Sequence, residues 1–367
     1  MSPDVTPALR LAGRGLLAAG ALAAGAALGA VAERSLLRAS ARPADDGESS
    51  EFGQLRGEVR QVAADDGVLL HVEIDDVPED VAQATERLTI VFAHGYALNL
   101  DSWHYQRQAL RGRARLVLYD QRSHGRSQRA DFDSHHVDQL GTDLASVIAA
   151  VAPTGPLMLV GHSMGGMTIM ALADQHPELF AERVYGVGLI ATTPGGLAEG
   201  SLGLPSAIGR TFHLLAPAVA ASLVKRKELV EWSHWSDSDL GLLLTRLYSF
   251  GSTASDAAGR FVASMVAATP IEVVAEFLPA LQEHDKRDAC RVFQSVEVLI
   301  LVGDSDRLTP KEQSEALLQL VPGADYVVVS DSGHMVTLEK HEQVDAALIV
   351  LLDRVLRDVR ADLASSA

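Results

Sequence analysis

A serine flanked by glycines is the residue of this chain best suited to covalent chemistry. The pentapeptide GHSMG at positions 161–165 follows the apolar run 157–160 and precedes a stretch rich in Met and Ala. A G-x-S-x-G motif between a strand and a helix indicates a sharp turn that exposes the serine hydroxyl, and the two outer glycines avoid Cβ clashes there. We therefore predict Ser163 as a nucleophile. The alternative is a glycine-rich turn whose serine is incidental.

A serine nucleophile needs a base, and the base needs an acid to orient it. With this motif the two partners follow the serine in the order acid, then histidine. Asp306 lies in the loop after the apolar run 298–302, with Asp304 as the alternative acid, and His334 follows the last apolar run, 327–329. Taken alone, Asp306 could cap a helix and His334 could lie on a surface loop. Their order and placement predict the triad Ser163–His334–Asp306.

Acyl transfer also needs hydrogen-bond donors for the negative charge that develops on the carbonyl oxygen. The backbone N–H of Tyr96, after a strand that ends in His-Gly, and that of Met164, after the serine, are the expected pair. We expect His94 to brace this turn rather than to act as a base. The polar turn 120–127, after the next strand, is expected to be scaffold.

The rest of the chain alternates short apolar runs with amphipathic stretches. Short runs bounded by turn residues predict buried strands, and periodic stretches between them predict helices, so the pattern indicates a mostly parallel sheet covered by helices. The expected strands are 58–64, 68–74, 88–93, 115–119, 157–160, 184–190, 296–302 and 326–329, the first two as a hairpin around Asp-Gly, and the expected helices are 103–110, 137–151, 165–175, 310–320 and 341–359.

Residues 194–289 interrupt this alternation with helical patterns and no convincing strand. We interpret them as a helical lid inserted into a core formed by 56–193 and 290–367. Trp103 near the Tyr96 turn, and Trp232 and Trp235 in the insertion, are candidate substrate contacts that suit an apolar acyl or aryl group. The alternative is that such side chains form the insertion's own core; the same segment holds Phe212, Leu214, Leu215, Phe261 and Phe277.

The first 55 residues differ from the rest. No charge occurs from Gly15 to Ala32, a stretch that would span roughly 27 Å as a helix, close to the ~30 Å hydrocarbon core of a bilayer. It could be an uncleaved membrane anchor, a cleavable export signal with an A-x-A site at 30–32, or a helix packed on the domain. We expect a membrane-anchored or exported protein with a polar linker over 40–55.

Composition excludes several classes of protein. The net charge of −17, from 31 Lys+Arg against 48 Asp+Glu, makes a nucleic-acid partner improbable on electrostatic grounds. The single cysteine, Cys290, excludes an intrachain disulfide and a Cys-based zinc cluster. A dense set of possible metal ligands stands just before a helix, where such residues also serve as caps, and we expect no metal there; it comprises Asp131, Asp133, His135, His136 and Asp138.

Together these motifs resemble the α/β-hydrolase superfamily from about residue 56 to 360. The resemblance is carried by HGY at 94–96, the turn 120–127, GHSMGG at 161–166, GDSD at 303–306 and GH at 333–334. The resemblance implies the α/β-hydrolase fold, with an eight-stranded, mostly parallel sheet, a helical lid and the predicted triad. The motifs are similar to those of the esterase, lipase and cofactor-free peroxidase branches. Dehalogenases and epoxide hydrolases would have an Asp at position 163.

The expected function is a serine hydrolase without a cofactor that cleaves carboxylic esters carrying apolar acyl or aryl groups. Its partners would be a small-molecule or lipid ester and a membrane reached through the N-terminal segment, with the oligomeric state left open. Alternatives on the same fold are a cofactor-free perhydrolase or haloperoxidase and a C–C-bond hydrolase. An alternative from another class is a catalytically silent binding protein.

Overall fold

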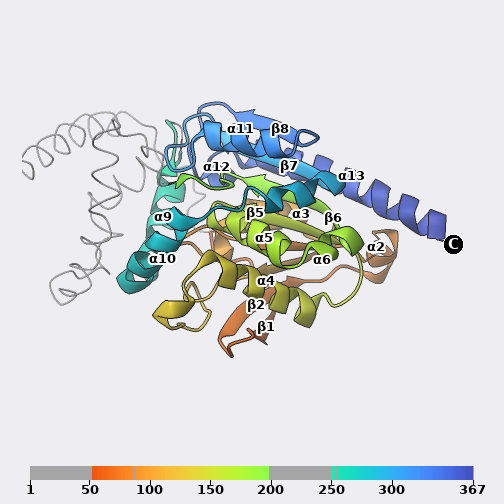
Figure 1. Ribbon diagram of the computed structural model, residues 1–367, viewed down its shortest axis with the longest axis horizontal. Coiled ribbons are helices and arrows are strands. Elements are labelled where there is room, and N and C mark those ends of the chain that lie inside the picture. Colours follow the sequence, from red (N-terminus) through yellow and green to blue (C-terminus); the bar gives the residue numbers. More distant parts are fainter. Residues whose placement is uncertain (1–51, 86, 198–248, 253, 367) are drawn as a thin grey trace, which may run out of the picture. The chain divides into compact units, whose positions relative to one another are not determined.

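The computed structural model describes residues 52–85, 87–197, 249–252 and 254–366 (Figure 1). In this part of the chain eight strands form one sheet in the order β1-β2-β4-β3-β5-β6-β7-β8. The strands are β1 (Glu58–Ala63), β2 (Leu69–Asp75), β3 (Thr89–Ala93), β4 (Arg115–Tyr119), β5 (Leu157–His162), β6 (Val184–Ile190), β7 (Glu297–Gly303) and β8 (Asp325–Val329). Pairing is antiparallel for β1–β2 and β2–β4 and parallel from β4 to β8, so the predicted eight-stranded, mostly parallel sheet is confirmed.

Helices cover both faces of the sheet (Figure 1). The α-helices are α2 (Glu79–Ala84), α3 (His104–Leu110), α4 (Val137–Val151), α5 (Met164–Gln175), α6 (Pro177–Glu182), α9 (Asp256–Ala268), α10 (Ile271–Glu283), α11 (Lys311–Leu320), α12 (Val336–Glu339) and α13 (His341–Ser366). The 3-10 helices are η2 (Leu100–Trp103), η3 (Phe132–Ser134) and η7 (Ala289–Ser295).

The strands are buried on both faces because alternate side chains enter two separate cores. Val91 of β3 and Leu159 of β5 pack with residues of α4, α5 and α11, whereas Phe92 and Val160 point the other way and pack with α3 and α13. Successive side chains of a strand point to opposite faces, so a continuous apolar run is what a sheet covered twice requires. This is why the short apolar runs were readable as strands.

The hairpin and most element ends agree with the sequence predictions. Gly67 adopts φ +86° in the β1–β2 turn, where its N–H donates to the Ala64 carbonyl at 3.0 Å. The short helices α2, α6 and α12 were not predicted because one or two turns show no readable periodicity. The last helix was predicted to end at Val359, but it continues to Ser366 through a final stretch that is mostly exposed to solvent and therefore carries no regular apolar pattern.

The described part of the 194–289 segment is helical and contains no strand, as its pattern predicted. Helices α9 and α10 lie between β6 and β7 in the chain and meet at 94°. Within the described ranges, no single helix is both long and apolar enough to cross a bilayer, and α9 and α10 pass that test only as a bent pair. The expected anchor or signal over 1–55 lies outside the described residues except for its last four, 52–55, and residues 198–248 lie outside them too.

Candidate active site

Ser163 occupies a strained turn between β5 and α5. Its backbone has φ 53° and ψ −118°, a positive-φ conformation that residues other than glycine rarely adopt. The turn is held by the Ser163 N–H, which donates to the Ile190 carbonyl at 2.9 Å, and by the Ser163 carbonyl, which accepts the Thr192 hydroxyl at 2.7 Å. Strain of this kind persists only where neighbours over-determine the backbone, and it is concentrated at functional sites.

The glycines of this turn are required by space. A Cβ on Gly161 would lie 2.5 Å from the backbone of Gly165, and a Cβ on Gly165 would lie 1.9 Å from the carbonyl oxygen of Ala93 at the end of β3. Real Cβ atoms do not approach backbone so closely. The G-x-S-x-G spacing therefore lets β5 turn into α5 while α5 packs directly on β3.

Asp306 and His334 are hydrogen-bonded partners in the loops after β7 and β8. His334 Nδ1 lies 2.9 Å from Asp306 Oδ2, and both residues are buried. Asp306 Oδ1 accepts the N–H groups of Leu308 at 2.8 Å and Thr309 at 3.0 Å, so the carboxylate is fixed from its own loop. The alternative acid, Asp304, is exposed and contacts Ser305 Oγ at 3.0 Å. The structure thus pairs the histidine with the first-choice acid.

His162 connects the serine turn to His334. Its Nε2 lies 2.9 Å from the His334 carbonyl oxygen, and the two imidazole rings are 4.9 Å apart. Ser163 is the next residue, and neighbouring Cα atoms are about 3.8 Å apart. The turn that carries the serine is therefore fixed against the segment that carries His334. Burial lowers the pKa of His162 to about 3, so its ring is neutral at pH 7.

Tyr96 and Met164 belong to one apolar cluster. Met164 is buried at the first position of α5, and Tyr96 packs against the same cluster together with Val273 and Phe277 of α10. The Tyr96 hydroxyl donates to the Val274 carbonyl, also in α10, and burial raises its pKa. Helix α10 therefore rests on both residues whose N–H groups were predicted to bind the oxyanion.

The turn after β4 holds the loop that carries Tyr96. The Gln121 N–H donates to His94 Nε2 at 2.9 Å, which confirms the expected bracing role of His94. Burial lowers the pKa of His94 to about 3, so this acceptor stays unprotonated at neutral pH. At the other end of the loop, Asp120 Oδ1 accepts the Leu100 N–H at 2.7 Å, and burial raises the pKa of Asp120 to about 6.

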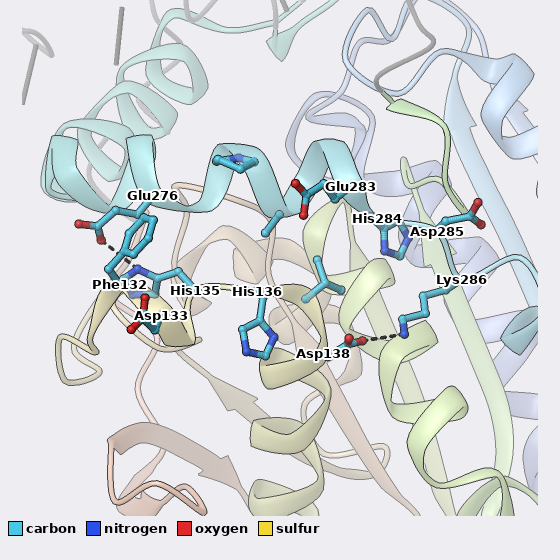
Figure 2. Close-up of a pocket in the computed structure, with 13 residues that line it drawn as sticks. Phe132, Asp133, His135, His136, Asp138, Glu276, Glu283, His284, Asp285 and Lys286 are labelled. Carbon is cyan, nitrogen blue, oxygen red and sulfur yellow. Dashed lines mark ion pairs between the residues drawn. The ribbon is translucent and has the colours of Figure 1, made fainter. Parts of the chain in front are cut away.

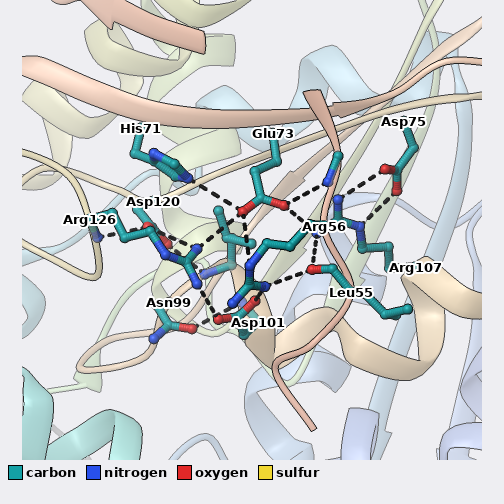
Figure 3. Close-up of polar contacts among 12 residues, drawn as sticks. Leu55, Arg56, His71, Glu73, Asp75, Asn99, Asp101, Arg107, Asp120 and Arg126 are labelled. Carbon is teal, nitrogen blue, oxygen red and sulfur yellow. Dashed lines mark hydrogen bonds and ion pairs between the residues drawn. The ribbon is translucent and has the colours of Figure 1, made fainter. Parts of the chain in front are cut away.

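A buried charge network is bonded to the same loop (Figure 3). Arg107 donates to Asp75 at 2.7 Å and to Glu73 at 2.8 Å, and all three side chains are almost fully buried. Arg126 extends the network from Glu73 to Asp101, which follows Leu100 in the loop. Sequence reasoning missed these groups because charges in a strand and a helix give no sign that they will meet.

The predicted tryptophan contacts have separate outcomes. Trp103 is 1% exposed and belongs to the core, with its ring 5.1 Å from Phe92 and 6.3 Å from His162. Trp232 and Trp235 lie outside the described residues, as do Phe212, Leu214 and Leu215. On the described side, α9 packs through Val262 and Met265 on Met335, the residue after His334. Apolar side chains of α9 and α10 therefore flank the segments of both His334 and Met164.

The Asp- and His-rich segment before α4 lies along a groove of about 440 Å³ beside α10 (Figure 2). Three of its side chains have other neighbours: His135 Nδ1 lies 2.9 Å from Glu276, His136 accepts the Gln139 N–H at 3.1 Å as the cap of α4, and Asp138, in the first turn of α4, forms an ion pair with Lys286 at 2.6 Å. Burial lowers the pKa of His135 to about 4, so its ring is neutral at pH 7. Among the described residues, no group of three His, Cys, Asp or Glu side chains is arranged to hold a metal ion.

Comparisons with known proteins agree with this fold. A family model described as the alpha/beta hydrolase family matches residues 90–347. The chain is 26% identical over 271 residues to a putative carbamate hydrolase RutD of Caulobacter sp. (strain K31), covering 73% of this chain and 92% of that protein. It is 27% identical over 262 residues to the mouse sn-1-specific diacylglycerol lipase ABHD11, covering 68% and 76%. Among solved structures, a thermophilic esterase from Thermogutta terrifontis is similar with a TM-score of 0.57 and 22% identity, over 82% of this chain and 99% of that one.

Proposed function

Since the chain belongs to the alpha/beta hydrolase family, we propose that it is a serine hydrolase that cleaves carboxylic esters with apolar acyl or aryl groups. The observation that carries this proposal is the buried Asp306–His334 pair, at 2.9 Å, fixed against the strained turn of Ser163 through His162. A nucleophile on a strained turn, a base, and an acid that orients the base are the parts that acyl transfer requires.

The chemistry would proceed in two halves. His334 accepts the proton of Ser163 as the serine oxygen bonds to the ester carbonyl carbon, and the N–H groups of Tyr96 and Met164 hold the oxyanion. His334 then gives the proton to the departing alcohol, leaving an acyl-serine. Water repeats the sequence, so one ester and one water become one acid and one alcohol. Asp306 keeps the proton of the neutral histidine on Nδ1, which leaves Nε2 free to act as the base.

The apolar substrate class rests on what surrounds these groups. Val273 and Phe277 of α10 contact the cluster of Tyr96 and Met164, and α9 contacts Met335. An acyl or aryl chain at this position would replace water along apolar walls, which favours binding in proportion to the apolar area that is buried. In this proposal the α9–α10 pair forms part of the lid.

The test is labelling and turnover with one substitution. Wild-type protein should be labelled by a fluorophosphonate and should hydrolyse p-nitrophenyl esters, with kcat/KM rising as the acyl chain lengthens over short and medium chains. Ser163→Ala should lose labelling and lower kcat by roughly 10⁶-fold without changing the unfolding midpoint. A carbamate and a diacylglycerol belong in the same panel, since relatives of this chain are named for those substrates.

A matched control is Ser305→Ala. Ser305 is an exposed serine in the acid loop whose hydroxyl contacts only the Asp304 side chain in the described structure, at 3.0 Å. It should keep wild-type labelling and turnover. Wild-type protein that is folded yet neither labelled nor active on any ester would overturn the assignment and favour a binding protein on this fold.

A further inference from the structure

We infer that His124 is a positioning residue that sets the place of the Tyr96 N–H, and that it does so only as a neutral imidazole with its proton on Nδ1. The inference rests on the proposed function, because the Tyr96 N–H is one of the two proposed oxyanion donors. His124 lies in the turn after β4, which the sequence assigned to scaffold, and it is 1% exposed.

The loop 94–100 is tied to the turn after β4 at three places. Its first residue is held through the bond from Gln121 to His94, and its last through the bond from Leu100 to Asp120. His124 supplies the middle tie: its Nε2 accepts the N–H of Ala97 at 3.2 Å. Of the three bonds, the one to Ala97 is nearest in sequence to Tyr96, so a change in this bond displaces the proposed oxyanion donor most directly.

The middle tie also holds a strained residue. Ala97 has φ 55°, a left-handed conformation that a residue with a Cβ adopts only under constraint. Relaxation of Ala97 would rotate the peptide that joins it to Tyr96. An acceptor fixed on the Ala97 N–H opposes that relaxation. The Ala97 carbonyl also accepts the Thr269 hydroxyl at 3.3 Å, and the Tyr96 hydroxyl donates to Val274, but His124 supplies the acceptor for the Ala97 N–H.

The direction of each bond fixes the tautomer. His124 Nδ1 lies 2.9 Å from the Arg122 carbonyl, which can only accept, so the proton is on Nδ1 and the lone pair of Nε2 faces Ala97. A second proton, on Nε2, would place one N–H donor opposite another, the N–H of Ala97. Burial lowers the pKa of His124 to about 4 and outweighs the hydrogen bond to the Arg122 carbonyl, which acts in the opposite direction; the charge of Arg129 lowers the pKa further.

The groups packed on the ring keep it in place and link it to α10. Its neighbours are the rings of His94 at 5.5 Å, Tyr96 at 6.4 Å and Phe277 at 5.5 Å. Burial lowers the pKa of His94 to about 3, so this neighbouring ring is neutral at pH 7. Phe277 belongs to α10, so the same imidazole touches the helix that covers the proposed oxyanion donors.

Two substitutions distinguish the two hydrogen bonds that the His124 imidazole makes, one to Ala97 and one to Arg122. The Oε1 of glutamine stands as many bonds from the backbone as Nε2, so His124→Gln keeps an acceptor for Ala97. The amide of asparagine reaches only as far as Nδ1, so His124→Asn keeps a donor for Arg122 and loses the acceptor. His176→Asn, at a partly exposed histidine between α5 and α6, is the matched control.

The assay measures kcat and KM on the best p-nitrophenyl ester, and inhibition by an alkylboronic acid and by the carboxylic acid product. A boronic acid forms a tetrahedral adduct on the serine whose oxygen occupies the oxyanion position, whereas the product acid does not. H124N should lower kcat and boronic acid affinity together by roughly 10- to 100-fold. KM, product inhibition and the H176N control should stay within about 3-fold, and H124Q should recover kcat to within about 5-fold.

The inference fails if H124N keeps wild-type kcat, if kcat falls while boronic acid affinity does not, or if folded H124Q is as impaired as H124N. His124→Leu, similar in size and without an acceptor, replaces H124N should the latter not fold. Failure of the proposed function looks different: wild-type protein itself would then lack ester turnover and labelling at Ser163.

Discussion

Replacing Gly165 by alanine would place a methyl group where the structure has the end of a strand. The added Cβ would lie 1.9 Å from the Ala93 carbonyl oxygen, 2.5 Å from the Ala93 carbonyl carbon and 2.9 Å from the His94 carbonyl oxygen. Ordinary contacts begin near 3.4 Å, so α5 and β3 must separate by at least about 1.5 Å. All three atoms are backbone, which cannot rotate away as a side chain would.

This displacement acts on both predicted oxyanion donors at once. Met164 precedes Gly165, and the loop that starts at His94 carries Tyr96, so the distance between the two N–H groups changes directly. A misplacement of about 1 Å can cost roughly 10²-fold in rate, or about 2.7 kcal/mol in transition-state binding. Overpacking of a dense core costs about 1–3 kcal/mol in stability. G165A should therefore lower kcat/KM by at least roughly 100-fold and shift the unfolding midpoint downward.

The assay is ester hydrolysis together with urea unfolding of purified G165A and a matched control. Gly323→Ala provides the control, because a Cβ on this exposed glycine meets nothing within 4 Å and its φ is not left-handed. It should change neither activity nor the midpoint measurably. Wild-type activity and stability in G165A would refute the reasoning that backbone contact at this glycine sets the geometry of the site.

Three further outcomes are expected. Asp306→Asn should lower kcat roughly 10⁴-fold because the base loses its orienting acceptor, whereas Asp304→Asn should stay within about 3-fold in the same ester assay; equal losses would contradict the pairing seen here. Arg107→Leu removes the buried guanidinium shared by Asp75 and Glu73, which keep Arg111 and Arg126 as partners, and should lower the free energy of unfolding by about 1–3 kcal/mol, measured by urea titration. Burial lowers the pKa of His94 and His162 to about 3, below the ~6.5 of the unfolded chain, so their stabilising effect is complete above about pH 6.5 and is lost as pH falls toward 3. Each should account for up to about 1.4 kcal/mol per pH unit, and a urea midpoint equal at pH 7 and pH 5 would contradict this.

Local pattern was enough to predict the sheet and the residues that follow its strands. The parallel strands are short apolar runs because both faces are buried, and this signal does not depend on which helix covers which face. The carboxyl ends of parallel strands lie at one edge of the sheet, so Tyr96, Ser163, Asp306 and His334 were expected to gather there. The glycines around Ser163 marked the turn because only glycine fits such close backbone contacts.

Side-chain partners across the fold could not be predicted in the same way. The segment with His135, His136 and Asp138 has the composition of a metal site, yet its side chains pair with α10 and Lys286 or cap α4. These partners are far away in the sequence, and a rotation about one or two side-chain bonds decides between them. Composition alone therefore could not tell ligand from ion pair.

The sequence by itself determined the strand order along the chain, the serine turn, and the short set of acids and bases that could serve it. Only the tertiary structure decided that His334 bonds to Asp306 rather than to Asp304, that Trp103 is buried in the core, and that His124 holds Ala97. The physical reason is the distance along the sequence over which each signal acts. Periodicity and glycine spacing act over a few residues, whereas each of these contacts depends on where separate loops meet after the sheet has formed.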